Sequence, residues 1–139
     1  MGKGMKMENE LRFHHVGIAC HDIAITRTFY VEQGYTAGDV VIDPLRDVKI
    51  CFLDKPGSPQ LELLAPLDES SPINRILSSQ GVTPYHICYA VDNIDAAVLE
   101  LRQKKFVCVS KTQPACALDG RGVCFMYHKH VGLIELLES

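Results

Sequence analysis

Short stretches in which apolar and polar residues alternate recur along the chain, and stretches with helical periodicity separate them. The alternating stretches are rich in Val, Ile, Leu and aromatic residues, which is typical of strands. Helical spacing predicts one helix from Asp22, a good capping residue, to about Gln33 before Gly34, and a second over 95–105. The predicted strands cover 15–20, 48–53, 60–64, 86–91, 106–110, 122–127 and 132–137, with 39–44 as a further candidate.

The two halves of the chain repeat one another. The segment His15-Val-Gly-Ile-Ala-Cys-His-Asp-Ile matches His86-Ile-Cys-Tyr-Ala-Val-Asp-Asn-Ile at its His, Ala and final Ile. Further along, Cys51-Phe-Leu corresponds to Cys124-Phe-Met, and Glu62-Leu-Leu to Glu135-Leu-Leu. Ordered matches at both ends of the two halves indicate an internal duplication.

Each half has the same order of elements, which predicts an α+β fold of two βαβββ modules. The modules are expected to form a curved mixed sheet around a metal-binding cleft, with a disordered leader over 1–12 and the modules over 13–67 and 85–139. The linker over 68–84 should contain a short helix, with Ser70 or Ser71 as its cap and Pro72 in its first turn.

Alternation places one His and one Glu of each module on the face opposite its apolar side chains. His15 and Glu62 are the pair in the first module, and His86 and Glu135 are the pair in the second. Small residues such as Gly17 flank the histidines and leave room for a ligand, whereas His14 is expected on the opposite face from His15. If a pseudo-twofold axis relates the modules, the four residues meet in one place.

The third long strand of each module contributes further candidates. Alternation along these strands predicts that Lys49, Cys51 and Leu53 share the cleft side, and that Gly122, Cys124 and Met126 do so in the second module. Near a divalent cation, Lys49 is a candidate base if its pKa is lowered, or a binding group for a substrate anion. A solvated strand lysine is the alternative.

Composition and charge limit the kinds of molecule that the chain is expected to bind. The net charge is −3 and the isoelectric point is about 6.0, so the chain lacks the basic field that holds a phosphate backbone. No apolar run suits a membrane span or a signal peptide. A cytoplasmic protein with a small-molecule substrate and no nucleic-acid or membrane partner is expected. The six cysteines show no Cys-x-x-Cys spacing and are interpreted as reduced thiols.

Two imidazoles and two carboxylates suit one divalent ion. Nickel, cobalt or zinc is expected first, with manganese or iron as alternatives. Such an ion polarises a carbonyl and makes a neighbouring C–H acidic, and a carboxylate that detaches from it can take the proton. Taken singly, each His is more often structural and each Glu more often solvated. The symmetric recurrence of the pair is what favours a metal site.

Several motifs resemble the vicinal-oxygen-chelate (glyoxalase/bleomycin-resistance/dioxygenase) superfamily, in the branch of methylmalonyl-CoA epimerases and small bacterial glyoxalase I proteins. They are His-Val-Gly-Ile-Ala (15–19), Glu-Leu-Leu-Ala-Pro-Leu (62–67), Ser-Pro-Ile (71–73), Tyr-His-Ile-Cys-Tyr-Ala-Val-Asp (85–92) and Gly-Leu-Ile-Glu-Leu-Leu-Glu (132–138). The resemblance implies His15, Glu62, His86 and Glu135 as metal ligands, Glu135 also as the base, and a homodimer.

Three functions follow from the resemblance. The first is a glyoxalase I-like lyase (lactoylglutathione lyase type), in which a 1,2-proton transfer through a metal-bound enediolate or enolate converts a hemithioacetal to a thioester. The alternative is methylmalonyl-CoA epimerase acting on an acyl-CoA, and the third is a metal-free antibiotic-binding resistance protein. Tyr85 replaces a His common in the epimerases, and Lys49 lies on the strand where some of them carry an acidic base. Arg121, in a loop that also departs from the epimerase pattern, is a candidate for a substrate carboxylate or phosphate, or a surface arginine.

Overall fold

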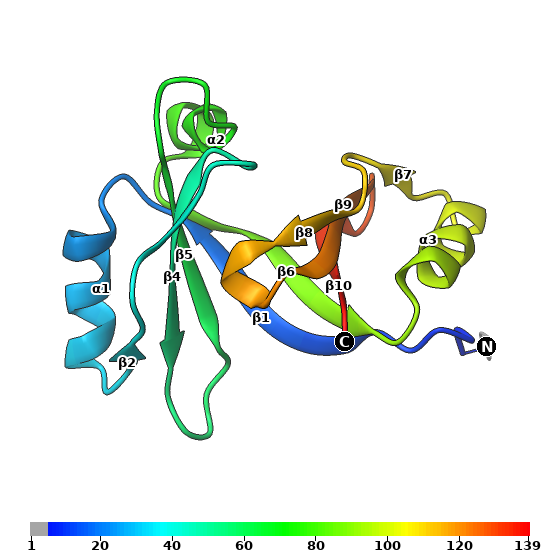
Figure 1. The fold of residues 1–139 in the computed structure, drawn as a ribbon, viewed down its shortest axis with the longest axis horizontal. Coiled ribbons are helices and arrows are strands. Elements are labelled where there is room, and N and C mark those ends of the chain that lie inside the picture. The colour runs from blue at the N-terminus through cyan, green and yellow to red at the C-terminus, as the bar shows by residue number, and fades with distance from the viewer. Residues whose placement is uncertain (1–5) are drawn as a thin grey trace.

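A computed structural model describes residues 6–139, which form three α-helices and one curved sheet (Figure 1). The first half contains β1 (Arg12–Ala19), α1 (Ile23–Glu32), β2 (Thr36–Ala37), β3 (Val41–Asp43), β4 (Val48–Asp54) and β5 (Leu61–Pro66). The helix α2 (Ile73–Gln80) joins it to the second half, which contains β6 (Thr83–Val91), α3 (Ile94–Gln103), β7 (Val107–Cys108), β8 (Gln113–Ala115), the short 3₁₀ helix η1 (Cys116–Leu118), β9 (Arg121–His128) and β10 (Gly132–Glu138). The short strands β2 and β3 both pair with β4, and β7 and β8 both pair with β9, so each pair takes the place of one strand. The α+β fold of two βαβββ modules is therefore confirmed.

The modules meet through their first strands. The sheet order is β2-β4-β5-β1-β6-β10-β9-β7, with β3 beside β4 and β8 beside β9. The strands β1 and β6 run antiparallel at the centre, while β5 runs parallel to β1 and β10 parallel to β6. Because β2 and β7 are the ends of this order, the sheet is curved but not closed within the described residues.

The helices α1 and α3 cover the outer face of the sheet at its two ends (Figure 1). Under α1, a core cluster includes Ile18, Ile23 and Leu63, each at most 6% exposed. Under α3, the equivalent cluster contains Ile94 and Leu136. The symmetric burial explains why the two halves share their apolar pattern, since each module must bury one helix against its own strands.

The helix boundaries follow from local caps. Asp22 caps α1 by accepting a hydrogen bond of 3.2 Å from the backbone N–H of Ile25. Asn93 caps α3 in the same way, so that helix begins slightly before the predicted start. The N-cap of α2 is Pro72, next to the predicted serines. None of the helices in residues 6–139 is long and apolar enough to span a bilayer.

The N-terminal segment differs from the predicted disordered leader over 1–12. Residues 1–5 lie outside the described residues, but Met7 and Leu11 pack against the α3 cluster and β1 already begins at Arg12. The carboxylate of Glu100 accepts hydrogen bonds of 2.9 Å from the backbone N–H of Asn9 and from its side-chain amide. The polar sequence of this segment has no periodicity, and its partners lie in the other half of the chain, so local pattern does not reveal its order.

Candidate metal centre

Four adjacent strands, β5, β1, β6 and β10, each contribute one side chain to a buried cluster on the concave face of the sheet. These side chains are Glu62, His15, His86 and Glu135, each at most 4% exposed. Their ligand atoms all lie within 4.8 Å of one another. The structure thus brings together the four residues that the sequence repeat singled out.

The donor atoms form a ring in which nitrogen and oxygen alternate. His15 Nε2 lies 3.0 Å from Glu62 Oε1 and 3.4 Å from Glu135 Oε1. His86 Nε2 lies 3.5 Å from the same Glu62 oxygen and 3.1 Å from the same Glu135 oxygen. Adjacent ligands of an ion with bonds of about 2.1 Å lie about 3.0 Å apart in an octahedron and about 3.4 Å apart in a tetrahedron. The spacing of this ring therefore fits a divalent ion.

Two of the four ring atoms have no hydrogen-bond partner among the described residues. His86 Nε2 and Glu135 Oε1 are buried and make no hydrogen bond within residues 6–139, although buried polar atoms are nearly always paired. A divalent ion would satisfy both. The orphaned atoms and the mixed imidazole–carboxylate donor set both support a metal site.

Electrostatics couples the four groups. Burial lowers the pKa of His15, but its close contacts with Glu135 and Glu62 and the charges of these carboxylates outweigh this and raise the pKa to about 9. The pKa of His86 is also raised, because the same two carboxylates outweigh its burial. Burial raises the pKa of Glu62 and Glu135, but close contacts with the two histidines bring the pKa of both below its ordinary value. In the metal-free cluster His15 therefore carries a proton at neutral pH that an incoming cation must displace.

Each glutamate of the cluster lies opposite a phenylalanine in the sheet. Phe52 of β4 pairs with Glu62, and Phe125 of β9 pairs with Glu135. The ring of Phe52 lies edge-on to His15 at 5.3 Å between centroids, and that of Phe125 lies edge-on to His86 at 5.1 Å. Alternation in the sequence did not predict these phenylalanines as site residues, although they stand at the centre of the repeated Cys-Phe-Leu and Cys-Phe-Met segments.

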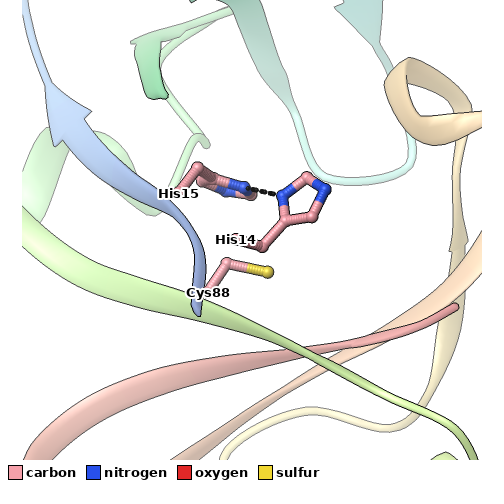
Figure 2. Close-up of side chains that lie close together, drawn as sticks. All are labelled: His14, His15 and Cys88. Carbon is pink, nitrogen blue, oxygen red and sulfur yellow. Dashed lines mark hydrogen bonds between the residues drawn. The ribbon is translucent and has the colours of Figure 1, made fainter. Parts of the chain in front are cut away.

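His14 lies beside His15, contrary to the prediction that the two occupy opposite faces. The pairing of β1 with β6 shifts register between Phe13 and His15, and this bulge brings the Nδ1 atoms of His14 and His15 to 2.8 Å from each other (Figure 2). A β-bulge commonly redirects a side chain next to a functional site. The contact occupies His15 Nδ1 and leaves Nε2 for the cluster, as a group that orients a metal ligand does.

Cys88 also lies next to the two histidines (Figure 2). Burial, followed by the charges of Glu135 and Glu62, raises the pKa of its thiol, which favours the protonated form. A protonated thiol is a poor metal ligand. The group of His14, His15 and Cys88 shares His15 with the four-residue cluster, so the two groups are not independent metal sites. All six cysteines of the chain are free.

The structure does not bring Lys49 to the cluster, so the prediction that it faces the cleft is wrong. Lys49 is exposed and lines a hollow of about 260 Å³ beside the start of α1, together with His21 and Asp22. Its same-face neighbours Cys51 and Leu53 pack in the core cluster under α1.

Cys124 and Met126 likewise pack under α3 instead of lining the cleft. The alternation predicted for β4 and β9 has the wrong phase, because both faces of these strands are apolar.

Arg46 is a site residue that the sequence pattern did not predict. It lies in the hairpin between β3 and β4, and its Nη1 lies 3.6 Å from Glu135 Oε2. A cleft of about 510 Å³ opens beside it, lined also by Tyr85 and Phe125. A single arginine in a short hairpin carries no sequence signal for such a role. Arg121, the arginine that the sequence suggested, instead bonds the Leu118 carbonyl at 3.4 Å.

Comparisons with known proteins agree on the family. Residues 14–125 match the sequence profile of the Glyoxalase/Bleomycin resistance protein/Dioxygenase superfamily. The chain is 35% identical over 132 residues to the mitochondrial methylmalonyl-CoA epimerase of Homo sapiens, covering 92% of this chain and 74% of that protein.

Solved structures agree as well. The methylmalonyl-CoA epimerase of Mycobacterium tuberculosis superposes with a TM-score of 0.83 at 29% identity, covering 96% of this chain and 92% of that one. A variant of the Streptomyces coelicolor epimerase in complex with 2-nitronate-propionyl-CoA gives a TM-score of 0.79 at 28% identity, covering 94% and 99%. The chain therefore belongs to the glyoxalase/bleomycin resistance protein/dioxygenase superfamily, also called the vicinal-oxygen-chelate superfamily, and is a metal-dependent enzyme of it.

Proposed function

We propose that the chain epimerises a methylmalonyl-CoA-like acyl thioester at the carbon between its carboxylate and its thioester. The observation that carries the proposal is the buried ring of His15, Glu62, His86 and Glu135 beside an open cleft. The names of the similar proteins favour this alternative over the glyoxalase I-like interpretation that the sequence analysis placed first. The complete ligand set also speaks against a metal-free binding protein.

The four residues would hold a divalent ion, which would act as a Lewis acid that polarises a carbonyl and makes the neighbouring C–H acidic. The chain itself must then remove and return a proton. Glu135 is the proposed base, because its Oε2 lies on the side of the ring that carries Arg46, toward the cleft. Glu62 holds the equivalent position in the other module, and we assign to it the second proton transfer that inversion requires. The proposed catalytic residues are thus Glu135 and Glu62.

The cleft suits a thioester with a short acyl group. Its polar lining residues are Arg46 and Asp47 from the first module, Ser70 from the linker, and Ser110 and Gln113 from the second module. Between these polar groups lie apolar side chains, which are Leu45, Pro72, Ile73, Ile76, Val109, Phe125 and Leu133. A mostly apolar pocket with a few polar groups is typical of a small-molecule site.

The test is proton exchange at the reacting carbon. We expect the metal-loaded protein to convert one epimer of methylmalonyl-CoA in D₂O to a mixture of both with deuterium at C2, as followed by NMR. A Glu135→Gln variant that keeps its metal should lose at least about 100-fold of this rate, since a general base contributes 10²–10⁴-fold. Absence of exchange, together with thioester formation from a methylglyoxal–thiol hemithioacetal, would instead support a glyoxalase I-like lyase.

Two further expectations remain predictions. A homodimer rests on the family resemblance, and light scattering of the purified protein tests it. A cytoplasmic location rests on the sequence pattern, and fractionation of the source cells tests it.

A further inference from the structure

The guanidinium of Arg46 is largely enclosed, and no atom of residues 6–139 accepts a hydrogen bond from it. The side chain is 15% exposed, and the nearest acidic atoms are Glu135 Oε2 at 3.6 Å from Nη1 and Asp43 Oδ2 at 3.9 Å from Nε. Its Nη2 is buried without a hydrogen-bond partner in residues 6–139. These distances exceed those of hydrogen bonds, so all three nitrogens have donors to spare.

Neither acidic neighbour of Arg46 lies within hydrogen-bond distance of its guanidinium. Glu135 shares its charge with His15 and His86, through contacts of 3.4 and 3.1 Å from its Oε1. Asp43 Oδ1 accepts a hydrogen bond of 3.3 Å from the backbone N–H of Arg46, while its Oδ2, which faces Arg46 Nε, has no hydrogen-bond partner in residues 6–139. Arg46 is therefore positioned by its charged neighbours, while the donor edge of its guanidinium stays free for a further acceptor.

Arg46 lines the same cleft as the residues that contact the metal cluster. Tyr85 and Phe125 also line it, and their rings lie edge-on to His86 at 4.5 and 5.1 Å between centroids. A molecule in this cleft would therefore meet Arg46 and the cluster together. Arg46 cannot act as the base, because a guanidinium stays charged at all working pH values.

We propose that Arg46 binds the carboxylate of the substrate through its free donors and so restricts the enzyme to thioesters with an anionic group beside the reacting carbon. The assignment rests on the proposed function. A planar guanidinium matches a carboxylate with two parallel hydrogen bonds, which a lysine cannot reproduce. In a malonyl-type thioester the carboxylate is attached to the carbon that loses its proton, so this contact would also orient that C–H bond toward Glu135.

The experiment measures binding of malonate, the simplest dicarboxylate of this type, to cobalt-loaded protein through the visible spectrum of the ion. Arg46→Gln should weaken malonate binding by about tenfold to a hundredfold, because charge-assisted hydrogen bonds are lost. Arg46→Lys should recover only part of the affinity. Arg75→Gln is the matched control, since Arg75 is exposed on α2, and it should bind malonate as the wild type does. The cobalt content should be equal in all four proteins.

An unchanged malonate affinity in an Arg46 variant that holds cobalt would overturn the assignment. Loss of cobalt from both Arg46 variants would overturn it too, since Arg46 would then support Glu135 instead of binding an anion. The readout needs no turnover. If malonate binding depends on Arg46 but methylmalonyl-CoA shows no exchange at C2, the proposed reaction fails and the anion site stands.

Discussion

The imidazole of His86 occupies the space that a side chain at Gly17 would take. The two residues lie opposite one another in the pairing of β1 with β6, and a Cβ built on Gly17 would lie 2.5 Å from His86 Nδ1. Real Cβ contacts are essentially never this short, so only glycine lets the ring lie across β1 toward His15 and the glutamates. The small residue expected to leave room for a ligand in fact makes room for a ligating side chain.

Gly17→Ala should therefore displace His86 and damage the metal site. We expect metal affinity to fall at least about tenfold, as when a group that orients a ligand is lost. Overpacking should also lower the free energy of unfolding by about 1–3 kcal/mol. Gly38→Ala is the control, because a Cβ there meets only ordinary contacts at 3.5 Å. Zinc titration and thermal unfolding measure both effects, and equal affinity in the two variants would refute the packing argument.

Removal of His14 should weaken metal binding without removing a ligand. His14 holds His15 through their Nδ1 atoms, 2.8 Å apart, and loss of such a partner typically lowers metal affinity about 10–100-fold. His21→Ala is the matched control, since His21 is exposed at the end of β1. Competition with a chromophoric chelator gives both affinities. If His14→Ala binds metal as tightly as His21→Ala, His14 does not orient His15.

The stability of the metal-free protein should fall as the pH rises above neutrality. The pKa of His15 is raised from 6.5 to about 9 in the folded state, because its contacts with Glu135 and Glu62 outweigh its burial. Because the pKa is higher in the folded state, protonation of His15 stabilises the folded protein. This contribution is fully present below the unfolded pKa of 6.5 and is lost as the pH rises toward 9. Metal binding requires neutral imidazoles, so metal affinity should rise over the same interval.

Differential scanning fluorimetry tests this pH dependence between pH 6.5 and about 8, a range in which most thiols stay protonated. The unfolding midpoint temperature of the metal-free protein should fall as the pH rises. The increase in this temperature produced by saturating zinc should grow over the same range. In the metal-free His15→Ala variant, the unfolding midpoint temperature should depend less on pH. A wild-type midpoint that rises across this interval would contradict the assigned pairing of His15 with the carboxylates.

Lys49→Ala should leave metal content and C2 exchange within about twofold of wild type, as expected for an exposed residue outside the cleft. The side chain lies on the α1 side of β4, whereas Phe52 on the other face contacts His15. Isotope exchange with metal-loaded protein measures the effect. A loss comparable to that of Glu135→Gln would restore Lys49 as a catalytic candidate.

The four-residue cluster could be predicted from sequence because charge marks the orientation of its strands. In β5, Leu61 and Leu63 alternate with Glu62, and in β10, Ile134 and Leu136 flank Glu135. A buried carboxylate among apolar neighbours can face only a polar site. Because the same pattern recurs in both modules, the sequence alone predicts that these four side chains converge, as they do in the structure.

In β4 the charged residue Lys49 does not mark the cleft face, because it lies on the α1 side of the strand. Val48, Ile50 and Phe52 on one face are as apolar as Cys51 and Leu53 on the other, and all five lie in or against core clusters. One face packs under α1 and the other under α2, so periodicity shows a strand buried on both sides without showing which side meets the cleft. The register of Phe52 with Glu62 decides this, and register is a long-range property.

The positions of His14 and Arg46 depend on contacts that local sequence does not encode. His14 turns toward His15 because β1 bulges against β6, a strand in the other module. Arg46 reaches Glu135 across the two modules, from a hairpin whose sequence is typical of any exposed turn. Residues of this kind need the assembled sheet before their roles can be inferred.

The most direct test of the central claim is metal stoichiometry. Elemental analysis of metal-loaded, gel-filtered protein should give about one divalent ion per chain, and none in a His15→Ala/Glu135→Ala double variant. A His128→Ala/His130→Ala variant is the control, because this pair, with rings 5.8 Å apart, offers an adventitious site. It should keep the ion. Stoichiometric binding that survives in the His15/Glu135 variant, or disappears in the His128/His130 variant, would contradict the site described here.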